Sequence, residues 1–173
     1  MLTGIKTILF TSNLSESSRV AFNHAGLLAS QLNAKIILLH VIEKIPESYE
    51  SRIVGLFGED RWTEILDRHK EEVQHALIGK ISTRQMAHTA LSEFCREAGI
   101  GKDQCGGNQN EIIIKEGDVI ETILQQAAEH DCDLIVMGAS KGLLSGTSVG
   151  HCIKSVLKKA NIPTLVVPTG QDK

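Results

Sequence analysis

The stretch Asp133–Pro168, DLIVMGASKGLLSGTSVGHCIKSVLKKANIPTLVVP, predicts a strand, a glycine-rich loop, a helix and a second strand in succession. Leu134–Met137 is a short apolar run, which is typical of a strand that is buried on both faces. Thr164–Val167 is a second run of this kind. Between the two runs, four apolar residues share one face of a predicted helix that begins near Gly150: Ile153, Val156, Leu157 and Ala160.

The loop inside this stretch is rich in groups that hold an anion. Four glycines fall within thirteen residues: Gly138, Gly142, Gly146 and Gly150. Glycine lets backbone N–H groups approach a phosphate closely, and side-chain donors stand between the glycines: Ser140, Lys141, Thr147 and Ser148. The start of the following helix adds its own free N–H groups and dipole. The pattern predicts a phosphate site, and a plain surface loop is the alternative.

The rest of the chain repeats the alternation of strand and helix. Three further apolar runs predict strands at Lys6–Ser12, Lys35–Ile42 and Glu111–Glu116, each followed by residues with helical periodicity or helix-forming composition. Glu43–Asp60 contains proline and glycine and is expected to be irregular, and Gly99–Asn110 is expected to be a polar loop. Five strands alternating with helices predict a single α/β domain over residues 1–173, built on a doubly wound parallel sheet.

Doubly wound sheets bind ligands beyond the carboxyl ends of their strands, at the point where the strand order reverses. The turns after the first and fourth strands are expected to lie there. These turns are Thr11–Ser15 and Gly138–Gly150.

Composition and charge narrow the classes of protein and partner. The chain has 173 residues and a formal net charge of −3, which argues against nonspecific binding of nucleic acid through a basic face. No apolar run approaches the roughly 18 residues of a membrane span, and no targeting segment is recognisable, so we expect a cytoplasmic protein that is not in the membrane. The cysteines form no CxxC pair and are expected to be reduced, and the histidines form no HxxxH motif, so no metal site is predicted.

Five segments in order resemble the universal stress protein family: ILFTSNLSESS, KIILLHVIE, IIIKEGDVIETIL, DLIVMGASKG and IPTLVV. The resemblance runs from Ile5 to Pro168. It implies a Rossmann-like domain of the adenine-nucleotide-binding type, with strand order 3-2-1-4-5. It also implies a cytoplasmic homodimer paired through the last strand, Thr164–Val167, and a regulatory or stress-protective role in place of a defined reaction.

One branch of this family binds ATP through the pattern G-x2-G-x9-G-[S/T] after the fourth strand, and another branch does not bind it. Gly138, Gly142 and Gly150 match the glycines, but this loop is one residue shorter and His151 stands at the hydroxyl position. Asn13 stands where the family has an aspartate that approaches adenine and ribose. The resemblance implies binding of ATP or AMP, with Mg²⁺ in the case of ATP, by these residues: Thr11, Ser12, Asn13, Val41, Gly138, Ser140, Lys141, Gly142, Gly146, Thr147, Ser148, Gly150 and His151.

Two other functions compete with nucleotide binding. The first is a stress protein that binds no nucleotide and acts through dimerisation and protein partners. The second is an enzyme on the same architecture, such as a nucleotide hydrolase, because a fold alone does not define an activity. No Ser–His–Asp order or paired carboxylates can be placed at the loop, so we assign no catalytic residue and do not expect an enzyme.

Overall fold

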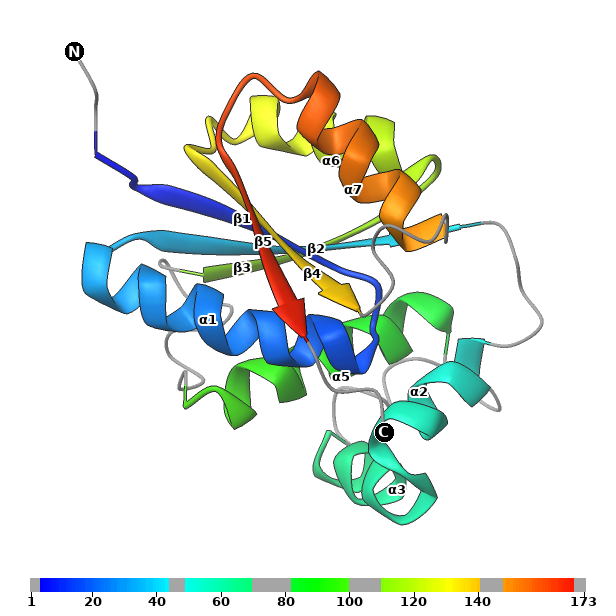
Figure 1. Cartoon of the computed structure of the whole chain (residues 1–173). Coiled ribbons are helices and arrows are strands. Elements are labelled where there is room, and N and C mark those ends of the chain that lie inside the picture. Colours follow the sequence, from blue (N-terminus) through cyan, green and yellow to red (C-terminus); the bar gives the residue numbers. More distant parts are fainter. Residues whose placement is uncertain (1–3, 44–48, 70–81, 100–109, 141–147, 170–173) are drawn as a thin grey trace.

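The structure is a computed structural model that describes residues 4–43, 49–69, 82–99, 110–140 and 148–169. A five-stranded parallel sheet runs through its centre in the order β3-β2-β1-β4-β5 (Figure 1). The strands are β1 (Thr7–Ser12), β2 (Lys35–Ile42), β3 (Asn110–Glu116), β4 (Leu134–Ser140) and β5 (Thr164–Thr169). The described helices are α1 (Glu16–Leu32), α2 (Tyr49–Phe57), α3 (Glu59–Arg68), α5 (Thr83–Glu97), α6 (Val119–Glu129) and α7 (Ser148–Lys159). This arrangement confirms the predicted class and strand order.

Alternate residues of the strands supply two hydrophobic cores, one on each face of the sheet. In β1, Ile8 and Phe10 pack on the side of α1 and α5, whereas Leu9 packs on the side of α6 and α7 (Figure 1). The ring of Phe10 meets that of Phe22 in α1 edge to face, with centroids 5.1 Å apart. Burial on both faces is the physical reason that the strands appear in the sequence as continuous apolar runs.

Helix α2 contradicts the expectation of irregular structure over Glu43–Asp60. Its residues Ile53 and Phe57 lie one helical turn apart and are buried in the same core as Phe94 of α5. Gly55, which suggested a turn, lies on the exposed side, where an added Cβ would meet nothing within 4 Å. Tertiary burial of two apolar side chains therefore outweighs the low helix propensity of one glycine.

The fourth strand is longer than the apolar run predicts. The ladder between β4 and β5 continues past Gly138, which pairs with Val167, to the end of the strand at Ser140. Gly138 therefore lies inside a strand and does not begin the loop. Helix α7 starts at Ser148, close to the predicted start at Gly150. Most of the predicted loop between Gly99 and Asn110 falls outside the described residues.

A buried carboxylate ties α3 to α5. The side chain of Glu93 is completely buried, and Arg96 donates hydrogen bonds to it from Nε at 3.0 Å and from Nη2 at 2.6 Å. Arg61 and Arg68 of α3 reach the same carboxylate at 3.2 and 3.4 Å. Burial raises the pKa of Glu93, but the hydrogen bonds and charges of Arg96 and Arg68 outweigh burial, so the pKa is lowered in the folded protein.

The described cysteines differ in bonding. Cys95 in α5 is disulfide-bonded, which contradicts the expectation that all the cysteines are reduced. Cys132 and Cys152 are free thiols. Within the part of the chain that the structure describes, no helix is both long and apolar enough to cross a membrane.

Candidate functional site

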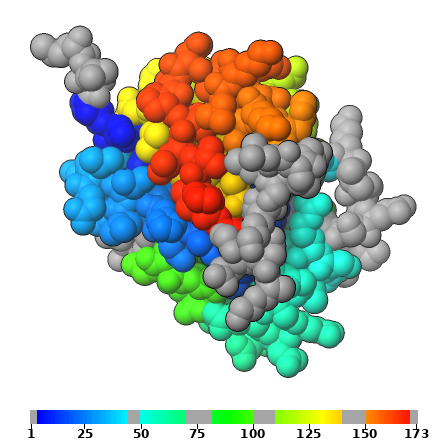
Figure 2. Space-filling view, in the orientation of Figure 1, coloured from blue at the N-terminus to red at the C-terminus, as the bar shows by residue number. Residues whose placement is uncertain are grey.

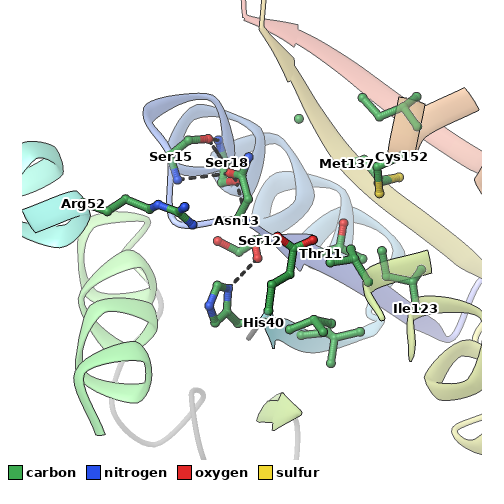
Figure 3. A pocket seen from close by; sticks show the side chains of 16 residues that line it. Thr11, Ser12, Asn13, Ser15, Ser18, His40, Arg52, Ile123, Met137 and Cys152 are labelled. Atoms are coloured by element: carbon green, nitrogen blue, oxygen red, sulfur yellow. Dashed lines mark hydrogen bonds between the residues drawn. The ribbon is translucent and has the colours of Figure 1, made fainter. Parts of the chain in front are cut away.

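A pocket of about 430 Å³ opens at the carboxyl ends of β1, β2 and β4 (Figure 3). This volume lies in the range of small-molecule sites, about 300–1,000 Å³. Strand β1 lies between β2 and β4, so the pocket occupies the point where the strand order reverses. Seven lining residues come from the three strands: Thr11, Ser12, Leu39, His40, Val41, Met137 and Gly138.

Three helices begin at this edge of the sheet. Helix α1 is capped by Ser15 and α6 by Asp118, whose carboxylate accepts a hydrogen bond from the N–H of Glu121 at 2.8 Å. Helix α7 follows β4 and places Cys152 and Ile153 on the pocket wall. The positive ends of three helix dipoles are therefore directed at one pocket, which favours a negatively charged ligand.

The pocket has an apolar half and a polar half. The apolar half lies beneath α6 and α7 and is formed by Leu39, Val41, Val119, Ile123, Met137 and Ile153. The polar half lies beside α1 and α2. Figure 3 shows Arg52, Asn13, Ser15 and Ser18 on one side, and Ile123, Met137 and Cys152 on the other. A ligand with an aromatic part and a charged part matches this division.

The side-chain oxygen of Asn13 organises the turn into α1. It accepts hydrogen bonds from the N–H of Ser15 at 3.1 Å, from Ser15 Oγ at 2.5 Å and from Ser18 Oγ at 2.6 Å. The intervening Leu14 is buried and has a φ of 58°, so this network holds the backbone in the left-handed region, which is unfavourable for leucine. Because a backbone N–H can only donate, the accepting atom is Oδ1, and the group that Asn13 offers to a ligand is its NH₂ donor.

His40 lies in β2 beneath the polar half of the pocket. It is only 2% exposed, and its Nδ1 lies 2.7 Å from the carbonyl oxygen of Ser12. A carbonyl oxygen only accepts, so Nδ1 carries the proton. Burial is the main cause that lowers the pKa of His40 to about 4; the positive charge of Arg52 adds to this effect and the hydrogen bond to Ser12 opposes it. His40 is therefore neutral near pH 7 and acts as a buried donor.

Gly138 lines the pocket, and the packing of α1 gives a separate reason for glycine there. A Cβ at this position would lie 2.6 Å from the carbonyl oxygen of Ser17 and 3.0 Å from Cβ of Ala21. The backbone of β4 and the first turn of α1 are therefore in direct contact. The structure therefore gives Gly138 a packing role beside α1, and its contact with an anion stays a prediction.

Charged and titratable side chains complete the lining. Arg52 lines the pocket from α2, and Glu43, the residue directly after β2, also lines it. The free thiol of Cys152 lies on the α7 wall, where burial and the carboxylates of Glu43 and Asp118 raise its pKa. Among the described residues, no group of three or more His, Cys, Asp or Glu side chains is arranged to hold a metal ion.

Comparison with known proteins identifies the family of this chain. The model of the Universal stress protein family matches residues 4–168. The chain belongs to this family. Universal stress protein MJ0577 of Methanocaldococcus jannaschii is 27% identical over 166 residues, which cover 94% of each chain. The match confirms the resemblance found in the sequence.

Solved structures of universal stress proteins share the fold. The structure of MJ0577 has a TM-score of 0.60 at 22% identity and covers 98% of this chain and 100% of its own. A family member from Arabidopsis thaliana with AMP bound has a TM-score of 0.57 at 19% identity and covers 96% and 94%. A universal stress protein in complex with cAMP has a TM-score of 0.53 at 18% identity and covers 95% and 98%.

In this universal stress protein, five of the residues predicted for the site line the pocket: Thr11, Ser12, Asn13, Val41 and Gly138. Ser140 ends β4 and Ser148 begins α7, while Gly150 and His151 lie in the first turn of α7. Four predicted residues lie outside the described part of the chain: Lys141, Gly142, Gly146 and Thr147.

Several lining residues were not predicted, and Arg52 and Glu43 are the most informative because they carry charge. Both fall in the stretch that was expected to be irregular. Only the apolar spacing of Ile53 and Phe57 hints at a helix there. His40 is both buried and part of the pocket floor.

Proposed function

We propose that this chain binds an adenine nucleotide, AMP or ATP, in the pocket at the carboxyl ends of β1, β2 and β4. The observation that carries the proposal is the convergence of three helix N-termini on a pocket with one apolar half. The base fits the apolar half near Val41, and the ribose fits beside Asn13. The 5′-phosphate belongs at the start of α7. When ATP is bound, Mg²⁺ accompanies its phosphates.

The bound ligands of related structures support this ligand class. The relative from Arabidopsis thaliana was crystallised with AMP and another family member with cAMP, so adenine and ribose are common to both. The most direct test is mass spectrometry of small molecules released when the purified protein is denatured. A copurified adenine nucleotide is the expected result. If nothing is released and neither AMP nor ATP raises the melting temperature, the proposal is wrong.

Two substitutions toward the family pattern probe where the nucleotide lies. His151 is exposed in the first turn of α7, and His151→Ser places a hydroxyl there. One added hydrogen bond to a phosphate should strengthen ATP binding by about 1 kcal/mol, measured by calorimetric titration. Asn13→Asp keeps one oxygen for the three donors from Ser15 and Ser18 and turns the other toward ribose hydroxyls. Unchanged ATP affinity in both variants would place the nucleotide elsewhere.

We infer a regulatory role in the cytoplasm and no efficient turnover. The pocket offers no nucleophile with an adjacent base among its described residues: His40 is buried with Nδ1 held by Ser12, and the thiol of Cys152 has a raised pKa. Phosphate release from ATP with Mg²⁺ should fall far below the ~1–10³ s⁻¹ of ordinary enzymes. A steady rate inside that range would overturn this inference.

Assembly through β5 is the second part of the proposal, and it is also the basis of the alternative function that needs no nucleotide. Strand β5 is at the edge of the sheet, and Figure 2 shows it open on the surface between α1 and α7. Leu165 in this strand is 38% exposed, and an open apolar edge favours pairing. We propose a homodimer through Thr164–Val167. Light scattering should give twice 18.8 kDa, and Leu165→Lys should shift the mass toward 18.8 kDa. A wild-type monomer at micromolar concentration would contradict the proposal.

A further inference from the structure

The polar half of the pocket presents hydrogen-bond donors and a cation next to one another. The oxygen of Asn13 is fully occupied by three donors from Ser15 and Ser18, so its NH₂ group is what remains for a ligand. The guanidinium of Arg52 extends from α2 toward this residue, as Figure 3 shows. A ligand group that meets both must be an acceptor, and an anion suits them best.

The charge of Arg52 is not neutralised by the described residues around it. Glu43 is the one carboxylate among the described lining residues, and no ion pair joins it to Arg52. The positive charge also acts on the pocket floor, since it contributes to the lowered pKa of His40. By contrast, the other arginines near this face, such as Arg19 and Arg61, are paired with glutamates.

The pocket thus has two regions with groups that can bind an anion. The first is the start of α7 on the wall that carries Cys152. The second is formed by Arg52 and Asn13 on the α1 and α2 side, and Figure 3 shows the labelled residues of these regions on opposite sides of the pocket. A simple 5′-nucleotide has anionic groups for one of them only.

We propose that Arg52 and the amide of Asn13 form a second phosphate subsite, and that the pocket prefers a nucleotide with a phosphoryl group on the ribose 2′ or 3′ oxygen in addition to its 5′-phosphate. This inference rests on the proposed nucleotide function, which puts the ribose beside Asn13. An arginine fork binds two phosphate oxygens at once, and an amide donor adds a third contact. An aspartate in place of Asn13 would repel such a group and pair with Arg52.

The test is calorimetric titration of AMP, adenosine 2′,5′-bisphosphate and adenosine 3′,5′-bisphosphate into the wild type and four variants. At least one bisphosphate should bind the wild type about tenfold more tightly than AMP, as expected for one charge-assisted contact that is partly open to water. This ratio should fall to near one in Arg52→Gln and in Asn13→Asp, and Arg52→Lys should retain part of it. Lys158→Gln removes the same charge from an exposed position in the last turn of α7 and should keep the full ratio.

The outcomes separate this inference from the proposed function. If AMP binds the wild type and neither bisphosphate binds better, the second subsite is wrong and the nucleotide function stands. If the tenfold ratio persists in Arg52→Gln, the extra phosphate is held elsewhere and the assignment is also wrong. If AMP, ATP and both bisphosphates all fail to bind, the proposed function fails and this inference fails with it.

Discussion

The imidazole Nδ1 of His40 lies 2.7 Å from the carbonyl oxygen of Ser12, so a buried side chain of β2 holds the last residue of β1 through a hydrogen bond. The pKa of His40 is lowered to about 4, mainly by burial, so the folded protein resists protonation of a side chain that the unfolded chain protonates near pH 6.5. Between these two values the unfolded state binds more protons, and stability therefore rises with pH.

We expect the free energy of unfolding to fall by about 3 kcal/mol from this residue as the pH drops from 6.5 to 4. His40→Asn keeps a donor for Ser12 and should lose this part of the pH dependence, whatever its absolute stability. Urea denaturation at several pH values measures the slope. His24→Gln removes an exposed histidine of α1 and serves as the matched control, with the wild-type slope expected. Equal slopes in wild type and His40→Asn would contradict the burial argument.

Glu93→Gln should destabilise the protein by about 1.5–3 kcal/mol at pH 7, because a buried carboxylate exchanges charge-assisted hydrogen bonds for neutral ones. The pKa of Glu93 is lower in the folded protein than in the unfolded chain, where it is about 4.3. The contribution of ionised Glu93 to the free energy of unfolding is therefore fully present above about pH 4.3 and is lost as the pH falls through the pKa of the folded protein. Arg96→Gln should cost less than about 1 kcal/mol, since that side chain is half exposed and Arg61 and Arg68 remain. Chemical denaturation at pH 7 and pH 3 distinguishes these cases.

Gly138→Ala should cost about 1–3 kcal/mol, because its Cβ would collide with the backbone of Ser17. Gly55→Ala is the matched control. It lies on the open side of α2, and there the same change should stabilise by about 0.5–1 kcal/mol through helix propensity. Thermal unfolding of both variants checks the pair. If Gly138→Ala is as stable as the wild type, α1 does not pack against β4 as closely as described.

Cys152 offers a chemical probe of pocket occupancy. Its raised pKa predicts slow alkylation at pH 7 and faster reaction as the pH rises, because the thiolate is the reactive form. AMP should protect it, and Glu43→Gln should speed the reaction by removing one of the carboxylates that raise its pKa. Peptide mapping by mass spectrometry gives the rate for each cysteine. Cys132 is the internal control: it is buried outside the pocket with a pKa of about 11, and AMP should leave its rate unchanged. Equal protection of both thiols would indicate general stabilisation of the fold by AMP.

The sheet was predictable from the sequence because burial on both faces leaves a continuous apolar run, as in Lys35–Ile42, whose predicted and observed bounds agree. The place of the pocket followed from topology, since carboxyl ends of parallel strands meet at one edge. The charge of the pocket was not predictable. Arg52 points toward Asn13 because Ile53 and Phe57 bury the other side of α2, and this packing depends on tertiary contacts that the sequence does not reveal.

The donor and acceptor roles within the site were equally hidden from the sequence. Which end of the Asn13 amide faces a ligand depends on the turn that Leu14 makes with its positive φ. The reason for glycine at position 138 is the close approach of α1 to β4. Neither the orientation of the Asn13 amide nor this approach can be predicted from composition or periodicity.

The contact between Gly138 and Ser17 also limits how the pocket can adapt. Backbone meets backbone there, so no rotamer change can widen or narrow the gap between β4 and α1. The position of this wall is therefore fixed. The side chain of Arg52 is long and exposed, so it can change rotamer to meet a charged group of a ligand at different positions. Discrimination by size therefore belongs to the β4–α1 wall, and adjustment to differently placed charges belongs to α2.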